Sequence, residues 1–292
     1  MLYVNLSKII LEAKRINENN KLWAVVKNDA YGLGLIEVAS ALIKSKIDSF
    51  VCISLNEAIV LRDLSKDIKI LLLGPIPYND LDIIRDNDII VSVNSFDDLK
   101  MLPSDIKRFV KINTSLNRFG IDYNNDLGKE VCYTHLAVSD IDVANKFLEY
   151  GNNIGSSKIL IGEVRVGYLL YKNAISVIEP IIYIRRVLEN SYVGYDYYTD
   201  KEILVGIINI GYYHGVDKRN KGRKVYINGN YYEIISICMN QTFIMIDESI
   251  KLYDDVELIG EHISIDDVSK YMNKSPYEEL VGYTKLKRKY IK

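Results

Sequence analysis

Strand-like and helix-like segments alternate along the chain from about Asn5 to Asn173, and this alternation is the feature that most restricts the fold. Regular alternation of this kind predicts a parallel sheet, and eight strand-like segments suggest closure into a (β/α)8-type barrel. The strand-like segments are residues 21–27, 50–55, 68–74, 88–94, 108–114, 130–135, 152–157 and 163–171.

Beyond Asn173 the strand-like segments are separated by turn residues instead of helix-like segments. Asn228 and Gly229 stand between two such segments, which is typical of a two-residue hairpin. The second part of the chain is therefore predicted to be mostly β. The predicted domains are residues 5–175 for the barrel and 176–292 for the mostly β domain, with residues 1–4 a segment that could pair with the latter.

Composition excludes several classes of function. A formal net charge of -2 over 292 residues offers no basic footprint for nucleic acid. No apolar run approaches the length of a membrane span. The three cysteines, Cys52, Cys132 and Cys238, are widely spaced and odd in number, which favours a reducing compartment and argues against a metal cluster. We therefore expect a cytoplasmic protein without a metal and without a nucleic-acid or membrane partner.

Polar residues recur where the predicted barrel strands end, and in such barrels this end carries the chemistry. A lysine at a buried strand end, such as Lys27, has a lowered pKa and can form a Schiff base, although a lysine that reaches solvent is the alternative. Serine and glycine turns can hold a phosphate, and arginines can bind an anion. The combination suggests pyridoxal 5′-phosphate. The residues concerned are Lys27, Arg118, His135, Ser156, Ser157 and Arg165.

The stretch "AVVKNDAYGLG" around Lys27 strongly resembles the cofactor-lysine segment of bacterial alanine racemases, which are fold-type III pyridoxal-phosphate enzymes. Further matching segments follow in the family's order over nearly the whole chain: "VKINTSLNRFG", "THLAVSD", "NIGSSKIL", "VRVGYLLYK", "VGYDYYT", "NIGYYHG", "ICMNQT" and "YTKLKRKY". The chain is identified as an unusually short member of this family.

The resemblance implies a role for each matching residue. It makes Lys27 and Tyr195 the two catalytic bases, and Arg118 and Met239 the substrate contacts. Lys111, which the family carbamylates, and Tyr212 are implied as supporting residues. Ser156, His214 and Asn240 stand where the family has Asn, Asp and Asp. The implied cofactor contacts are Lys27, Tyr31, His135, Ser156, Ser157, Arg165, Gly167 and Tyr283.

The resemblance also implies racemisation of L-alanine and D-alanine by a two-base mechanism, which would supply D-alanine for cell-wall synthesis. It implies a homodimer with shared active sites, since Tyr195 reaches the site of the opposite subunit in the family. The alternatives are a racemase of broader amino-acid specificity, or a reduced pyridoxal-phosphate-binding homologue with little or no racemase activity. A fold-type III decarboxylase is disfavoured, because Arg165 opposite the ring nitrogen weakens the electron sink that decarboxylation needs.

Two connections of the predicted barrel are short. Arg118 and His135 are 17 positions apart, and Ser157 and Arg165 are 8 apart. A parallel crossover normally needs about a dozen residues or more. The sequence therefore predicts a barrel that has lost its fifth and seventh helices.

Overall fold

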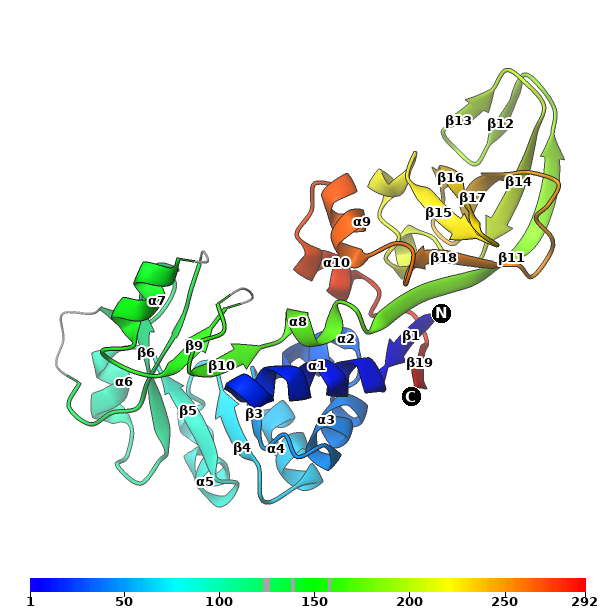
Figure 1. The fold of residues 1–292 in the computed structure, drawn as a ribbon. Helices are drawn as coiled ribbons and strands as arrows, with labels where there is room; N and C mark the ends of the chain where they lie inside the picture. The colour runs from blue at the N-terminus through cyan, green and yellow to red at the C-terminus, as the bar shows by residue number, and fades with distance from the viewer. Residues whose placement is uncertain (123–126, 138–139, 157–158) are drawn as a thin grey trace. The chain divides into compact units, whose positions relative to one another are not determined.

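The computed structural model describes residues 1–122, 127–137, 140–156 and 159–292. The chain divides into two compact units (Figure 1). One unit comprises Lys8–Leu170, and the other comprises Met1–Ser7 together with Tyr171–Lys292. Ser157, one of the predicted phosphate contacts, lies outside the described residues.

The unit Lys8–Leu170 is a closed barrel of parallel strands, which confirms the predicted fold. Closure comes from β10, which pairs with β2 so that Arg165 lies opposite Trp23. The barrel strands are β2 (Lys21–Val25), β3 (Ser49–Cys52), β4 (Lys69–Leu72), β5 (Ile89–Val93), β6 (Arg108–Asn113), β8 (Cys132–His135), β9 (Asn153–Gly155) and β10 (Glu163–Val166).

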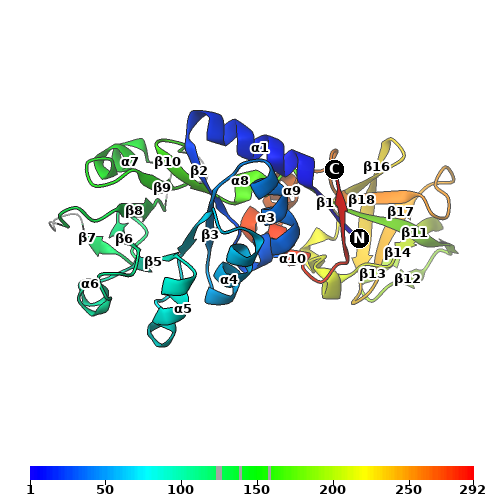
Figure 2. The same cartoon turned by 90° about the horizontal axis from the view of Figure 1, so that it is seen from below.

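Helices cover the outside of the barrel unevenly, as Figures 1 and 2 show for α3, α4 and α5. Strand β6 is followed by the two-residue strand β7 (Ile121–Asp122), which pairs beside it. In the described parts of the connections after β6 and β9 there is no helix, as the short spacings predicted. The helices are α1 (Leu6–Asn19), α2 (Lys27–Gly32), α3 (Leu35–Lys44), α4 (Leu55–Leu64), α5 (Leu81–Asp86) after the 3₁₀ turn η1 (Tyr78–Asp80), α6 (Phe96–Met101), α7 (Ile141–Phe147) and α8 (Tyr168–Tyr171).

The second unit is built on a mostly antiparallel sheet in which β11 pairs with both β14 and β18. The segment at the start of the chain joins this sheet, because β1 pairs antiparallel with β11 and parallel with β19. The mostly β character predicted from the sequence is confirmed. Its strands are β1 (Leu2–Asn5), β11 (Ile175–Val187), β12 (Ser191–Val193), β13 (Tyr197–Thr199), β14 (Ile203–Ile208), β15 (Lys224–Ile227), β16 (Asn230–Ile237), β17 (Thr242–Ile246), β18 (Asp255–Ile259) and β19 (Arg288–Ile291).

Local sequence explains the turns and helices of this unit. Asn228 and Gly229 have φ angles of 47° and 90° and join β15 to β16, which confirms the predicted hairpin. Two helices, α9 (Ile265–Tyr271) and α10 (Pro276–Gly282), were not expected. Both begin with a capping box, at Ser264 and Ser275, and this pattern could have revealed them. Two 3₁₀ turns, η2 (Tyr212–His214) and η3 (Lys218–Asn220), complete the unit. None of the helices in the described part of the chain has the length and apolar character that crossing a membrane requires.

Candidate functional site

Lys27 directly follows the first barrel strand and begins an unusual left-handed turn. The four residues from Asn28 to Tyr31 have φ angles of 54°, 57°, 51° and 60°. This conformation costs about 1–2 kcal/mol per non-glycine residue and persists where surrounding contacts enforce it, often at functional sites. Here Asp29 accepts a hydrogen bond from the Leu35 N–H at 2.7 Å. Glu57 on α4 accepts one from the Asp29 N–H at 3.0 Å.

The turn brings Tyr31 against the end of the last barrel strand. A Cβ atom at Gly167 would lie 2.3 Å from the Tyr31 hydroxyl oxygen, so only glycine fits there. Ser156, at the end of β9, is buried, and its hydroxyl accepts a hydrogen bond from the Ile159 N–H at 3.1 Å. Strand ends that are far apart in sequence thus form a cup of hydroxyl and backbone groups, as a phosphate site requires.

Arg165 lies buried in the barrel, where its guanidinium is held by hydrogen bonds. It donates to the Asn153 carbonyl oxygen at 3.2 Å, to the side-chain oxygen of Asn153 and to the carbonyl oxygen of Thr134. The guanidinium carbon lies 4.5 Å from the centre of the Tyr133 ring. Burial lowers the pKa of Arg165 to about 10. This value is still well above neutral pH, so the guanidinium keeps its proton there.

The side chains of Arg165 and His135 both lie close to Gly155. A Cβ atom at Gly155 would lie 2.4 Å from Nη2 of Arg165 and 2.5 Å from Nδ1 of His135. Desolvation and the charges of nearby cations, Arg165 first among them, lower the pKa of His135 to about 4. The imidazole is therefore neutral at physiological pH.

Two lysines lie in the same cationic environment. Desolvation, followed by the charge of Arg118, lowers the pKa of Lys27, while Glu57 acts in the opposite direction. Desolvation and the charges of Arg118 and Arg165 lower the pKa of the buried Lys111 to about 8. Among the described residues, no carboxylate forms an ion pair with these two lysines or with Arg118 or Arg165. This accumulation of positive charge favours an anionic ligand.

Three of the predicted site residues belong to the second unit and lie near Cys238: Tyr195, Tyr212 and Met239. A Cβ atom at Gly194, the residue before Tyr195, would lie 3.5 Å from Sγ of Cys238. The Tyr212 N–H donates to the Cys238 carbonyl oxygen at 3.1 Å, and Met239 is the next residue. All three predicted side chains are exposed, Tyr195 the most at 80%. They are thus available on the surface of their unit.

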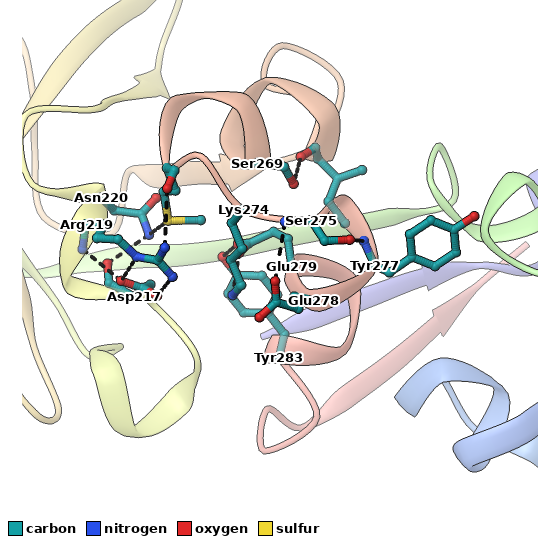
Figure 3. A network of polar contacts seen from close by, with 12 residues as sticks. Asp217, Arg219, Asn220, Ser269, Lys274, Ser275, Tyr277, Glu278, Glu279 and Tyr283 are labelled. Carbon is teal, nitrogen blue, oxygen red and sulfur yellow. Dashed lines mark hydrogen bonds and ion pairs between the residues drawn. The ribbon is translucent and has the colours of Figure 1, made fainter. Parts of the chain in front are cut away.

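Tyr283 has different surroundings, because its side chain is fully buried within the second unit. Its hydroxyl donates a hydrogen bond of 2.5 Å to Oε1 of Glu279, which is also buried (Figure 3). Lys274 forms an ion pair of 3.2 Å with the other oxygen of Glu279. Burial and the Glu279 charge raise the pKa of Tyr283 well above its ordinary value. The only hydroxyl proton of Tyr283 is therefore already engaged, and its phosphate role stays a prediction.

Sequence reasoning missed Glu57, Asn153 and Glu279. Glu57 could have been found, because it stands three residues after Ser54, the N-cap of α4. It uses its carboxylate to hold Ile53 and Asp29 instead of completing the cap. Glu279 could also have been considered, because it stands four residues before Tyr283 at the end of α10, whereas Asn153 carries no comparable signal, because folding brings Arg165 to it.

A closed barrel with a lysine at its first strand end, followed by a mostly β unit, defines a two-domain barrel protein with a cationic site. Two family models match the chain: the alanine racemase N-terminal domain over residues 5–148 and the alanine racemase C-terminal domain over residues 174–290. The chain belongs to the alanine racemase family.

Individual alanine racemases are similar to this chain in sequence and in fold. The alanine racemase of Streptococcus pyogenes (strain Manfredo) is 28% identical over 91% of this chain and 90% of its own length. The structure of alanine racemase from Bacillus anthracis with bound L-Ala-P has a TM-score of 0.85 and 24% identity, covering 100% of this chain and 94% of that one. That of Bartonella henselae with covalently bound pyridoxal phosphate has a TM-score of 0.87 and 22% identity, covering 100% and 99%.

We expect Gly167→Ala to destabilise the protein by about 1–3 kcal/mol, the usual cost of overpacking. The added methyl group would lie 2.3 Å from the Tyr31 hydroxyl oxygen, so the turn after Lys27 would have to shift. Urea denaturation measures the effect. Gly282→Ala is the matched control, because the nearest atom to an added Cβ there would be the Gly215 carbonyl oxygen, 3.8 Å away. Equal stability of the two variants would contradict the close approach of Tyr31 and Gly167.

We expect Glu279→Ala to destabilise the protein by about 3–5 kcal/mol, because it leaves the Lys274 ammonium without its carboxylate in a largely buried place. Thermal and urea unfolding would measure the loss. Glu261→Ala, at an exposed position, should change stability by no more than about 0.5 kcal/mol. A Glu279→Ala protein as stable as the control would show that the network in Figure 3 contributes little.

Proposed function

We propose that this protein is a pyridoxal-phosphate-dependent alanine racemase that interconverts L-alanine and D-alanine. The observation that carries the proposal is the strand-end amine of Lys27, with its lowered pKa, followed by the left-handed turn that brings Tyr31 onto Gly167. Family membership and the alanine racemases among its relatives support the same activity. The D-alanine produced would serve cell-wall synthesis.

The barrel residues fit the proposed cofactor. The cup formed by Tyr31, Gly167 and Ser156 leaves no room for a side chain at Gly167, and it matches the needs of a phosphate. Lys27 would bond to the cofactor aldehyde, and Arg165 would face its ring nitrogen. His135 would lie beside the ring, while Ser157 and Tyr283 remain further predicted contacts. When bound, pyridoxal phosphate withdraws electrons from the substrate and makes its α-proton acidic.

Racemisation requires that a proton leave one face of the substrate and return to the other, so two bases must act. We assign these roles to Lys27 and Tyr195. A free tyrosine has a pKa near ~10, so Tyr195 needs nearby positive charge to act as a base near neutrality. Arg118 and the backbone of Met239 would bind the substrate carboxylate, and Tyr212 would support the site. Arg165 retains its proton and so does not protonate the ring nitrogen, which limits side reactions.

Lys111 is proposed to support Arg118. Its pKa of about 8 makes its amine partly neutral near neutral pH, and only the neutral amine can react with carbon dioxide. A carbamate there would place a negative charge near Arg118, which has no ion-pair partner among the described residues. This charge would orient the guanidinium toward the substrate.

The two proposed bases belong to different units, Lys27 to Lys8–Leu170 and Tyr195 to the unit that contains Tyr171–Lys292. We infer a homodimer in which each site combines Lys27 of one subunit with Tyr195 of the other. A symmetric pair of such contacts yields two equivalent sites.

Borohydride treatment of the purified protein with pyridoxal phosphate should fix the cofactor on the peptide that contains Lys27. The same protein should convert L-alanine to D-alanine in a chiral chromatography assay. Lys27→Ala should lose both properties, because it lacks the amine. Lys44→Ala, on helix α3, is a control that should keep both. Labelling of another lysine, with Lys27 unmodified, would contradict the assignment.

Mixing two inactive variants, Lys27→Ala and Tyr195→Phe, should restore activity. Tyr195→Phe alone should lower the rate by ~10²–10⁴-fold, because it removes only the proton acceptor. After subunit exchange about half of the dimers are mixed, and each mixed dimer has one intact site. About a quarter of the wild-type activity should therefore return. The measurement is the racemisation rate after mixing.

Two controls make this result interpretable. Subunit exchange must be verified, for example by mass spectrometry of differently labelled subunits. Each variant incubated alone through the same exchange procedure should stay inactive. If exchange occurs and no activity returns, the sites are not shared between subunits.

A further inference from the structure

A cavity of about 340 Å³ lies at the N-terminal end of the barrel strands. Lys27 and His135, by contrast, stand where strands β2 and β8 end, so the cavity lies at the barrel end opposite the proposed catalytic site. Six of its lining residues are at the first or second position of their strands: Lys21, Lys69, Phe109, Cys132, Asn153 and Glu163.

Aromatic rings form part of the cavity wall. The rings of Trp23 and Phe109 meet edge to face, with centroids 5.5 Å apart and an interplanar angle of 69°. The Trp23 indole N–H donates to Oε2 of Glu163 at 2.8 Å, and the Lys21 ammonium lies 5.9 Å from the centre of the ring, so Trp23 forms a fully buried, fixed part of the wall. The cavity volume is near the lower end of the range for small-molecule sites, which favours an occupant with a single ring.

The charges around the cavity leave one positive charge uncompensated. Lys21 forms an ion pair of 2.7 Å with Glu163. Lys69, an exposed residue of the same wall, forms no ion pair with any residue in the described ranges. An occupant with one negative charge would therefore complement this wall, whereas a dianion would face the carboxylate of Glu163 without a second free cation.

We propose that this cavity binds a small aromatic monocarboxylate. Its ring would pack against Phe109 and Val131, the partly and largely exposed apolar side chains of the lining, and its carboxylate would pair with Lys69. The proposal does not rest on the proposed racemase activity, because only one lining residue, Asn153, also contacts a residue of that site, the guanidinium of Arg165. Entry is beside Val131, a lining residue whose side chain is 52% exposed.

The single tryptophan of the chain makes the proposal directly measurable, because Trp23 lines the cavity. We would titrate the cofactor-loaded protein with benzoate and follow tryptophan emission. Benzyl alcohol is the neutral probe of similar size. Benzoate should produce a saturable change, and it should bind more tightly than benzyl alcohol.

Two variants test the roles of residues that line the cavity. Lys69→Gln should weaken benzoate roughly two- to five-fold, the size of an exposed ion pair, and leave benzyl alcohol unchanged. Lys66→Gln, which removes an exposed lysine outside the cavity lining, is the matched control and should change neither probe. Val131→Phe should narrow the entrance and weaken both probes. Melting temperatures and the unliganded emission spectrum verify that each variant is folded, and Lys69→Gln suffices if Val131→Phe does not fold.

Three outcomes would overturn the proposal. The first is a change in emission that increases linearly without saturation. The second is equal binding of benzoate and benzyl alcohol with no effect of Lys69→Gln, which would indicate an apolar cavity without preference for a carboxylate. The third is benzoate binding that Lys69→Gln leaves intact but Arg118→Gln abolishes, which would locate the benzoate at the catalytic end.

Discussion

The pairing of β10 with β2 is the contact on which the proposed cofactor site depends. It closes the barrel and sets Arg165 opposite Trp23, so the first and last strands end side by side. This pairing brings Lys27, which follows the first barrel strand, and Gly167, which follows the last, to one end of the sheet. The left-handed turn then carries Tyr31 back over Gly167, and this approach leaves no room for a Cβ atom. A barrel that stayed open here would separate the amine from the phosphate cup.

Positive charge dominates this end of the barrel. Desolvation and the charges of Arg118 and Arg165 lower the pKa of Lys111, and desolvation together with these arginines and the two lysines lowers the pKa of His135. Such a cluster is unfavourable by itself, because like charges repel and burial removes hydration. An anionic ligand would relieve the repulsion, so binding and stability are coupled in this site. The fixed orientation of Arg165, held by Asn153 and Thr134, means that its charge needs no rearrangement when the ligand binds.

The short connections of the barrel do not disturb the strand ends that carry the site. The described parts of the connections after β6 and β9 have no helix, yet the strands themselves pair in order around the barrel. Parallel strands are held by hydrogen bonds to their neighbours and by the packed interior, so a covering helix can be absent while the strand ends keep their positions. The opposite end of the barrel contains a cavity that combines aromatic rings with a lysine, Lys69, that forms no ion pair with the residues the structure describes.

The sequence by itself determined the alternating strands, the mostly β second unit and the two missing helices, because periodicity and spacing are local properties. It also identified Lys27, Arg118, His135 and Arg165, since polar residues at the ends of parallel strands must meet at one edge. The hairpin at Asn228 and Gly229 was predictable for the same local reason.

Tertiary structure alone decided the rest. The left-handed turn from Asn28 to Tyr31 could not be predicted, because its residues disfavour that conformation and contacts formed on folding, such as the hydrogen bond between Asp29 and Glu57, help to maintain it. The partner of Tyr283 is Glu279, a residue that motif comparison had not singled out. Strand pairing of β1 with both β11 and β19 likewise joins segments from the two ends of the chain. The contact of Asp29 with Glu57 and the choice of β11 and β19 as the partners of β1 join residues distant in sequence, so no local pattern in the sequence records them.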